Sequence, residues 1–159
     1  MDSLIYEDTP RYDTLLKAIM VLPVFLFVFF IITGVYCLII GEVAAAIGMF
    51  AATLLVAAYL WIIFPRKYQI LDSKFRIVLG GPLHFDIPFN NLETAVEGSW
   101  IDMMHLWSLS LNFVTCYSKN IVKIVRKKGL KVNITPNNLD LFLENLNKAL
   151  NDWRRYNLR

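Results

Sequence analysis

Residues 18–64 constrain this chain more than any other stretch. They number 47 and include a single charged residue, Glu42, near the middle. A bilayer core of about 30 Å needs about 20 apolar residues in a helix, and residues 18–40 and 43–64 supply 23 and 22 uncharged residues. Two spans joined by Gly41 and Glu42 alone must be antiparallel neighbours. We therefore expect a transmembrane helical hairpin with Glu42 among the lipid headgroups.

Two other interpretations of this stretch fit less well. A secretory signal needs a basic leader and an apolar region of about 7–15 residues, whereas this leader is acidic and the apolar run is far longer. A single long helix would place Glu42 in hydrocarbon, at a cost of several kcal/mol.

Basic residues flank the two spans on one side only. Arg11 and Lys17 precede the first span, Arg66 and Lys67 follow the second, and the turn between the spans has no basic residue. Cytoplasmic segments next to membrane spans carry an excess of Lys and Arg. The pattern predicts a multi-pass protein of the cell membrane with both termini, and everything after Pro65, in the cytoplasm.

Small residues recur at every fourth position of the second span, at Ala44, Gly48 and Ala52. Such a helix-packing stripe lets another helix backbone approach closely. We favour packing of Gly34, in the first span, against this stripe, because the two spans must pack against each other anyway. Contact with another subunit is the alternative.

The rest of the chain divides into two parts. Residues 1–17 read as a short cytoplasmic tail with a helical lead-in, and residues 65–159 are enough for one small domain. Residues 66–159 carry 14 Lys and Arg against 8 Asp and Glu, a net charge of +6. A basic domain next to a membrane suits anionic lipid. No recognition helix, RNP-like motif or zinc knuckle is present in the sequence, so a nucleic-acid partner is not expected.

Beyond Pro65 the apolar residues alternate with a period of two, which is typical of half-buried strands. We expect strands at residues 67–71, 74–79, 83–87, 92–96, 106–115, 120–125 and 130–134. From Leu139 the period becomes helical, and Thr135-Pro136 supplies a helix start. The predicted fold class is α+β, with a curled antiparallel sheet of about seven strands closed by a C-terminal amphipathic helix.

This layout resembles the bacterial pleckstrin-homology-like (PH-like) domain in its membrane-anchored form with two N-terminal spans. The resemblance rests on two spans leading into FPRKYQILDSKFRIVLGG, on FDIPFNNLETAVEG, and on KNIVKIVRKKGLKVNITPNNLDLFLENLNKAL. It implies a fold rather than a chemistry, because PH-like folds serve lipid binding, protein docking and scaffolding. The segment GSWIDMMHLW departs from the pattern, being unusually apolar for a loop between strands.

The sequence holds no grouping that catalysis requires. His84 and His105 are the two histidines, and Asp102 with His105 is too small a set for a metal site. Cys37 and Cys116 show neither metal-ligand nor disulfide spacing, and no Gly-rich phosphate loop is present. We therefore expect no enzymatic activity, no cofactor and no bound metal.

A basic hairpin is the first candidate binding site. It comprises Lys123, Arg126, Lys127, Lys128 and Lys131. It could face anionic lipid, at about 1 kcal/mol per charge near the surface, or it could be a solvated turn that keeps the domain soluble. A turn at the end of the sheet where Pro65 enters would lie close to lipid, and a turn at the opposite end would not.

An apolar patch is the second candidate. It comprises Trp100, Ile101, Met103, Met104 and Trp107. Aromatic and Met side chains suit a docking or interfacial patch. We favour burial of this segment in the core, since exposed apolar patches of that size are uncommon on monomers.

The sequence therefore predicts a non-enzymatic, membrane-anchored PH-like module that docks or scaffolds another protein at the cytoplasmic membrane face. Two alternatives stay open. One is an accessory subunit of a membrane enzyme or transporter complex, which would use the small-residue stripe. The other is a module that binds anionic lipid through the basic hairpin.

Overall fold

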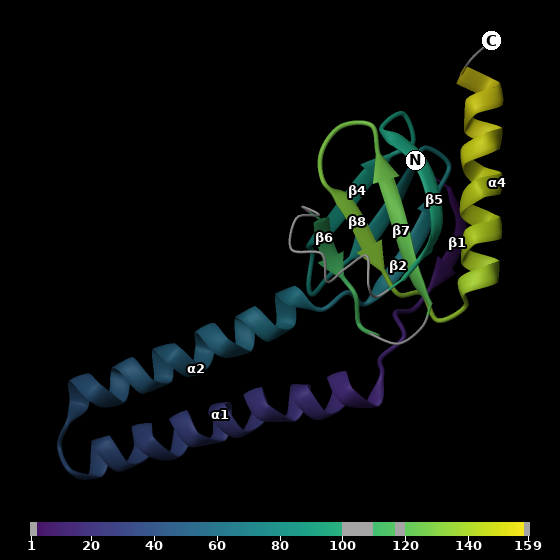
Figure 1. Ribbon diagram of the computed structural model, residues 1–159. Coiled ribbons are helices and arrows are strands. Elements are labelled where there is room, and N and C mark those ends of the chain that lie inside the picture. Colours follow the sequence, from purple (N-terminus) through teal and green to yellow (C-terminus); the bar gives the residue numbers. More distant parts are fainter. Residues whose placement is uncertain (1–2, 100–109, 117–119, 158–159) are drawn as a thin grey trace. The chain divides into compact units, whose positions relative to one another are not determined.

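The computed structural model describes residues 3–99, 110–116 and 120–157 (Figure 1). The chain forms two compact units. The helical unit is Thr14–Ile63, and the sheet unit combines Met1–Asp13 with Phe64–Arg159. The chain thus leaves the sheet unit after Asp13 and returns to it at Phe64.

The helical unit is a hairpin of α1 (Thr14–Ile39) and α2 (Val43–Ile63), as the sequence predicts. Gly41 takes a positive φ of 84° in the turn between them, which glycine adopts without steric cost. Among the described residues, Val43–Ile62 is long and apolar enough to cross a membrane, while the apolar stretch of α1, Pro23–Ile39, is shorter. By this criterion one span is found where the sequence predicts two.

The first sheet of the sheet unit is antiparallel, in the order β1-β2-β3-β4. Its strands are β1 (Leu4–Asp8), β2 (Lys67–Leu71), β3 (Lys74–Val78) and β4 (His84–Pro88). The last three lie where the alternation predicts them.

Strand β1 corrects the expectation that residues 1–17 are a tail with a helical lead-in. Its pairing with β2 is reinforced by side chains: Glu7 accepts hydrogen bonds from Lys67 (2.7 Å) and Gln69 (2.8 Å). Asp8 accepts a hydrogen bond from the backbone N–H of Asn138, at 3.0 Å. These partners are distant in sequence, so local periodicity carries no sign of them.

The second sheet has the order β5-β7-β8-β6. Its strands are β5 (Leu92–Gly98), β6 (Ser110–Phe113), β7 (Ile121–Arg126) and β8 (Lys131–Ile134). Strand β6 runs parallel to β8, while the other pairs are antiparallel. The described strands thus form two open sheets of four, one with a parallel pair, rather than a single curled antiparallel sheet of about seven. With two sheets, the apolar face of each sheet can pack on the same core as the C-terminal helix.

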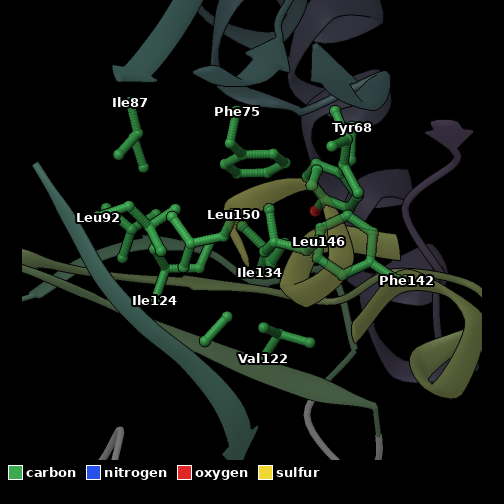
Figure 2. Packing of buried hydrophobic residues seen from close by; sticks show 14 of the residues in the cluster. Tyr68, Phe75, Ile87, Leu92, Val122, Ile124, Ile134, Phe142, Leu146 and Leu150 are labelled. Atoms are coloured by element: carbon green, nitrogen blue, oxygen red, sulfur yellow. The ribbon is translucent and has the colours of Figure 1, made fainter. Parts of the chain in front are cut away.

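The core lies between the sheets and α4 (Leu139–Asn157), as Figure 2 shows. Helix α4 buries Phe142, Leu146, Ala149 and Leu150, which belong to the apolar stripe predicted from the sequence. The rings of Tyr68 and Phe75 meet Phe142 edge to face, with centroids 6.3 and 5.7 Å away. The prediction of an amphipathic closing helix is confirmed.

The sheet unit has two ends, distinguished by the segments that meet there. At the exit end the chain leaves and returns: the Tyr12 hydroxyl donates to the Pro65 carbonyl (2.7 Å), and the Arg66 N–H donates to the Val78 carbonyl (2.7 Å). The far end carries the turns after β2, β4 and β7, where the Phe89 N–H donates to the Ser73 carbonyl (2.9 Å). The five residues of β2 separate the two ends by about 17 Å, at about 3.3 Å per residue.

Candidate functional site

The basic hairpin forms between β7 and β8, and Asn91 makes three hydrogen bonds to its turn. Asn91 accepts hydrogen bonds from the N–H of Lys127 at its carbonyl and from the N–H of Lys128 at its side chain, both at 2.8 Å. Its side-chain amide donates back to the Lys128 carbonyl at 3.0 Å. The turn is therefore fixed in one conformation against the segment that joins the two sheets.

Arg126 contributes to the same turn instead of projecting into solvent. Its Nε donates to the Leu130 carbonyl at 2.6 Å, and its guanidinium lies 5.6 Å from the centre of the Phe85 ring. Gly129 takes a φ of 98°. This leaves Lys127, Lys128 and Lys131 as the exposed cations of the predicted basic hairpin, since Arg126 and Lys123 are half-buried.

The basic turn lies at the far end of the sheet unit, because Asn91 follows β4 and Arg126 pairs with Leu92 at the start of β5. The points at which the chain leaves for the helical unit are at the other end. By the criterion set from the sequence, this position does not favour lipid contact through the turn.

A groove that the sequence did not reveal lies at the far end, between α4 and the first sheet. Its volume is about 410 Å³, within the range of binding clefts. Ile5 of β1 and Asp72 of the β2–β3 turn form one wall, and the second half of α4 forms the other. We call it the α4 groove.

The α4 groove combines apolar and polar lining. Ile5 is 46% exposed and Tyr156 is 85% exposed, while Trp153 is half-buried with its ring against Phe89, 6.4 Å between centroids. Asp72, Lys148 and Asp152 also line the groove. Exposed aromatic and aliphatic side chains beside polar groups are the composition of protein-docking surfaces. The sequence signal was limited to Trp153 and Tyr156 at the edge of the helical stripe, because Ile5 and Asp72 reach the groove only through the pairing of β1 with β2.

The apolar patch of Trp100, Ile101, Met103, Met104 and Trp107 lies outside the described residues. Its assignment to core or to an exposed surface stays a prediction.

Gly34 does not pack against the helix-packing stripe of Ala44, Gly48 and Ala52, which is the arrangement favoured on sequence grounds. A methyl group at Gly34 would lie 3.1 Å from the Phe50 ring and 3.4 Å from Met49, so Gly34 admits these side chains rather than the stripe. At Gly48 a methyl group would meet no described atom within 4 Å. Ala44 is exposed and Ala52 is half-buried. Within the described chain, the Ala44 and Gly48 part of the stripe faces away from α1.

The two helices of the hairpin expose apolar side chains on the faces that do not meet each other. Phe25, Phe29 and Ile32 of α1 are exposed, as are Ile47, Leu54 and Leu55 of α2. Such an all-apolar surface is typical of helices buried in a larger core or in a membrane.

The outer face of the first sheet carries an ion-pair cluster. Asp86 on β4 accepts hydrogen bonds from Nε and Nη2 of Arg76, at 2.7 and 2.9 Å, and lies 3.1 Å from the Lys74 ammonium. The hydrogen bonds from Arg76 lower the pKa of Asp86 to about 2, so the cluster is held as paired charges. These partners satisfy the carboxylate, which argues for a structural role.

No three His, Cys, Asp or Glu side chains in the described residues are grouped to hold a metal ion. Cys37 and Cys116 are not joined in a disulfide, and Cys116 is buried in the sheet unit.

Comparison with known proteins identifies no relative: no family model, no curated protein and no solved structure matches the chain.

Proposed function

We propose that this chain is a non-enzymatic docking module that the α1–α2 hairpin anchors in a membrane and that recruits another protein at the cytoplasmic face. Both helices would cross the bilayer, with Glu42 in the headgroups on the far side. Their exposed apolar surfaces and the one-sided basic flanks at Arg11, Lys17, Arg66 and Lys67 support this arrangement.

The observation that carries the proposal is the separation of the two ends of the sheet unit. Tyr12 and Pro65 are joined at the exit end, while Ile5, Trp153 and Tyr156 open the α4 groove at the far end. A module tethered at one end keeps the other accessible to a cytoplasmic protein, which supports docking over direct lipid binding.

We propose further that the sheet unit is a PH-like domain. Two sheets that pack on a C-terminal helix support this assignment. In this domain, the parallel pairing of β6 with β8 and the strand β1, which precedes the hairpin, are additions to the layout predicted from the sequence.

The test is purification of the intact chain from its own membranes in mild detergent, with a groove variant beside a matched control. Tyr156→Asp changes an exposed residue of the groove, and Leu141→Asp changes an exposed residue of α4 that does not line it. We expect a stoichiometric protein partner that is lost with Tyr156→Asp and kept with Leu141→Asp. Retention of the partner by both variants would contradict docking at the groove.

A second candidate function is an accessory subunit of a membrane complex. The open space beside Gly48 favours it, because another helix could approach there. Gly48→Leu in the intact chain should then release the partner while Tyr156→Asp retains it. The same purification therefore separates the two functions.

A further inference from the structure

We propose that the turn between β3 and β4, residues 79–83, inserts its apolar tip into the surface of the bilayer. This inference rests on the membrane anchorage proposed above and adds a lipid-contact site other than the basic hairpin, for which lipid contact was one of two open interpretations.

Chain connectivity brings the exit end close to the ends of the helices. Asp13 is bonded to Thr14 of α1, and Phe64 is bonded to Ile63 of α2, whatever the orientation of the two units. Within the sheet unit both exits are held firmly: Tyr12 donates to the Pro65 carbonyl at 2.7 Å, and the Asp13 N–H donates to the Thr115 carbonyl at 3.2 Å. Neither exit is a flexible linker that would let this end move far from the bilayer.

The β3–β4 turn lies at this same end. The Arg66 N–H bonds to the Val78 carbonyl, so residues after Val78 extend beyond the start of β2, alongside Pro65. The Leu79 N–H donates to the Leu83 carbonyl at 2.9 Å and closes the turn, while Gly81 takes a φ of 67°. The turn is thus a closed turn at the exit end of the sheet unit.

The turn carries exposed apolar surface. Gly81 and Pro82 at its tip are exposed, as is Leu83 (43%), which closes the turn opposite the half-buried Leu79, while Gly80 is buried. The turn contains no charged residue, so its tip can enter the headgroup region without desolvating a charge.

The flanking charges suit an anionic membrane surface. Arg11 and Arg66 are exposed at the exit end, and cations next to a membrane are attracted by anionic lipid. By contrast, Lys127 and Lys128 lie at the far end, about 17 Å of strand away. The β3–β4 turn is therefore the lipid contact of the sheet unit, and the lysine turn is not.

The experiment uses the full chain in vesicles of phosphatidylcholine and phosphatidylglycerol, in a background in which Cys37 and Cys116 are replaced by alanine. An environment-sensitive fluorophore is attached at Leu83→Cys, at the far-end control Lys128→Cys, or at Leu54→Cys on the exposed face of α2. Collisional quenching by lipids brominated near the top of the acyl chain is then measured, and circular dichroism confirms that each variant is folded.

We expect strong quenching at position 54, quenching at position 83 that is several-fold greater than at position 128, and a blue-shifted emission at position 83. Quenching at position 54 with none at position 83 would overturn the turn insertion and leave the anchorage intact. Absence of quenching at position 54 would instead overturn the anchorage. Stronger quenching at position 128 than at position 83 would return lipid contact to the basic hairpin.

Discussion

Phe142 is the residue whose removal tests the packing of the sheet unit most directly. Its side chain is fully buried and meets three rings edge to face: Phe75, Tyr68 and Tyr6, at centroid distances of 5.7, 6.3 and 6.5 Å (Figure 2 labels the first two). These rings come from β3, β2 and β1, so Phe142 joins the closing helix to three strands of the first sheet.

Phe142→Ala should lower the free energy of unfolding by about 4 kcal/mol. Large-to-small changes of a buried Phe cost about 3–5 kcal/mol, and each edge-to-face pair adds about 0.5–1.5 kcal/mol beyond area burial, which favours the upper part of that range. A domain of this size has about 5–15 kcal/mol in total. The variant should therefore be close to unfolding.

The assay is urea unfolding of the purified full chain in detergent, followed by tryptophan fluorescence. Leu141→Ala is the matched control, since Leu141 is the preceding residue and 47% exposed; its cost should stay below about 1 kcal/mol. A Tyr6→Ala and Phe142→Ala double-mutant cycle should give a coupling of about 0.5–1.5 kcal/mol. Equal effects of the two single changes at 142 and 141, or no coupling to Tyr6, would refute the packing of β1 against α4.

Three further predictions concern single interactions. The low pKa of Asp86, about 2, arises from its hydrogen bonds to Arg76. The ionised carboxylate therefore stabilises the fold above its unfolded pKa of about 3.9, and this stabilisation is lost as the pH falls through about 2. In Asp86→Asn, the fall in the free energy of unfolding on acidification should be smaller by about 1–2 kcal/mol, as measured by urea titrations at a series of pH values. Gly129→Ala should cost about 1–3 kcal/mol in thermal or urea unfolding, because φ is 98° and the new methyl would lie 2.6 Å from an Arg126 nitrogen; an unchanged midpoint would contradict the turn geometry. Tyr12→Phe deletes the 2.7 Å hydrogen bond at the exit end and should cost about 1 kcal/mol, with faster amide exchange at Arg66 as the local readout.

Much of the fold follows from the sequence because its signals are local. The alternation in β2, β3 and β4 reflects one buried face per strand, and the stripe from Leu139 reflects one buried face of α4. A long apolar stretch with one central charge likewise predicts the hairpin of α1 and α2.

The features that were missed depend on partners far along the chain. Residues 4–8 include two acidic side chains, and they become a strand only because β2 supplies Lys67 and Gln69, which lie 60 and 62 residues after Glu7. The α4 groove needs Ile5, Asp72 and Tyr156 together, a set that exists only after this pairing. The position of the basic turn at the far end follows from its hydrogen bonds to Asn91, an uncharged residue that a search for clusters of basic residues does not consider. Gly34 was matched to the wrong partner because small-residue spacing does not say which face of α2 meets α1.

The central claim, a hairpin that crosses the membrane twice and leaves the sheet unit in the cytoplasm, is tested most directly by cysteine labelling in intact cells. Glu42→Cys lies between α1 and α2, and Asn90→Cys is exposed at the far end of the sheet unit. In a background with Cys37 and Cys116 replaced, a membrane-impermeant maleimide should label position 42 in intact cells and position 90 only after permeabilisation. Labelling of position 90 in intact cells, or protection of position 42 until permeabilisation, would contradict the claim.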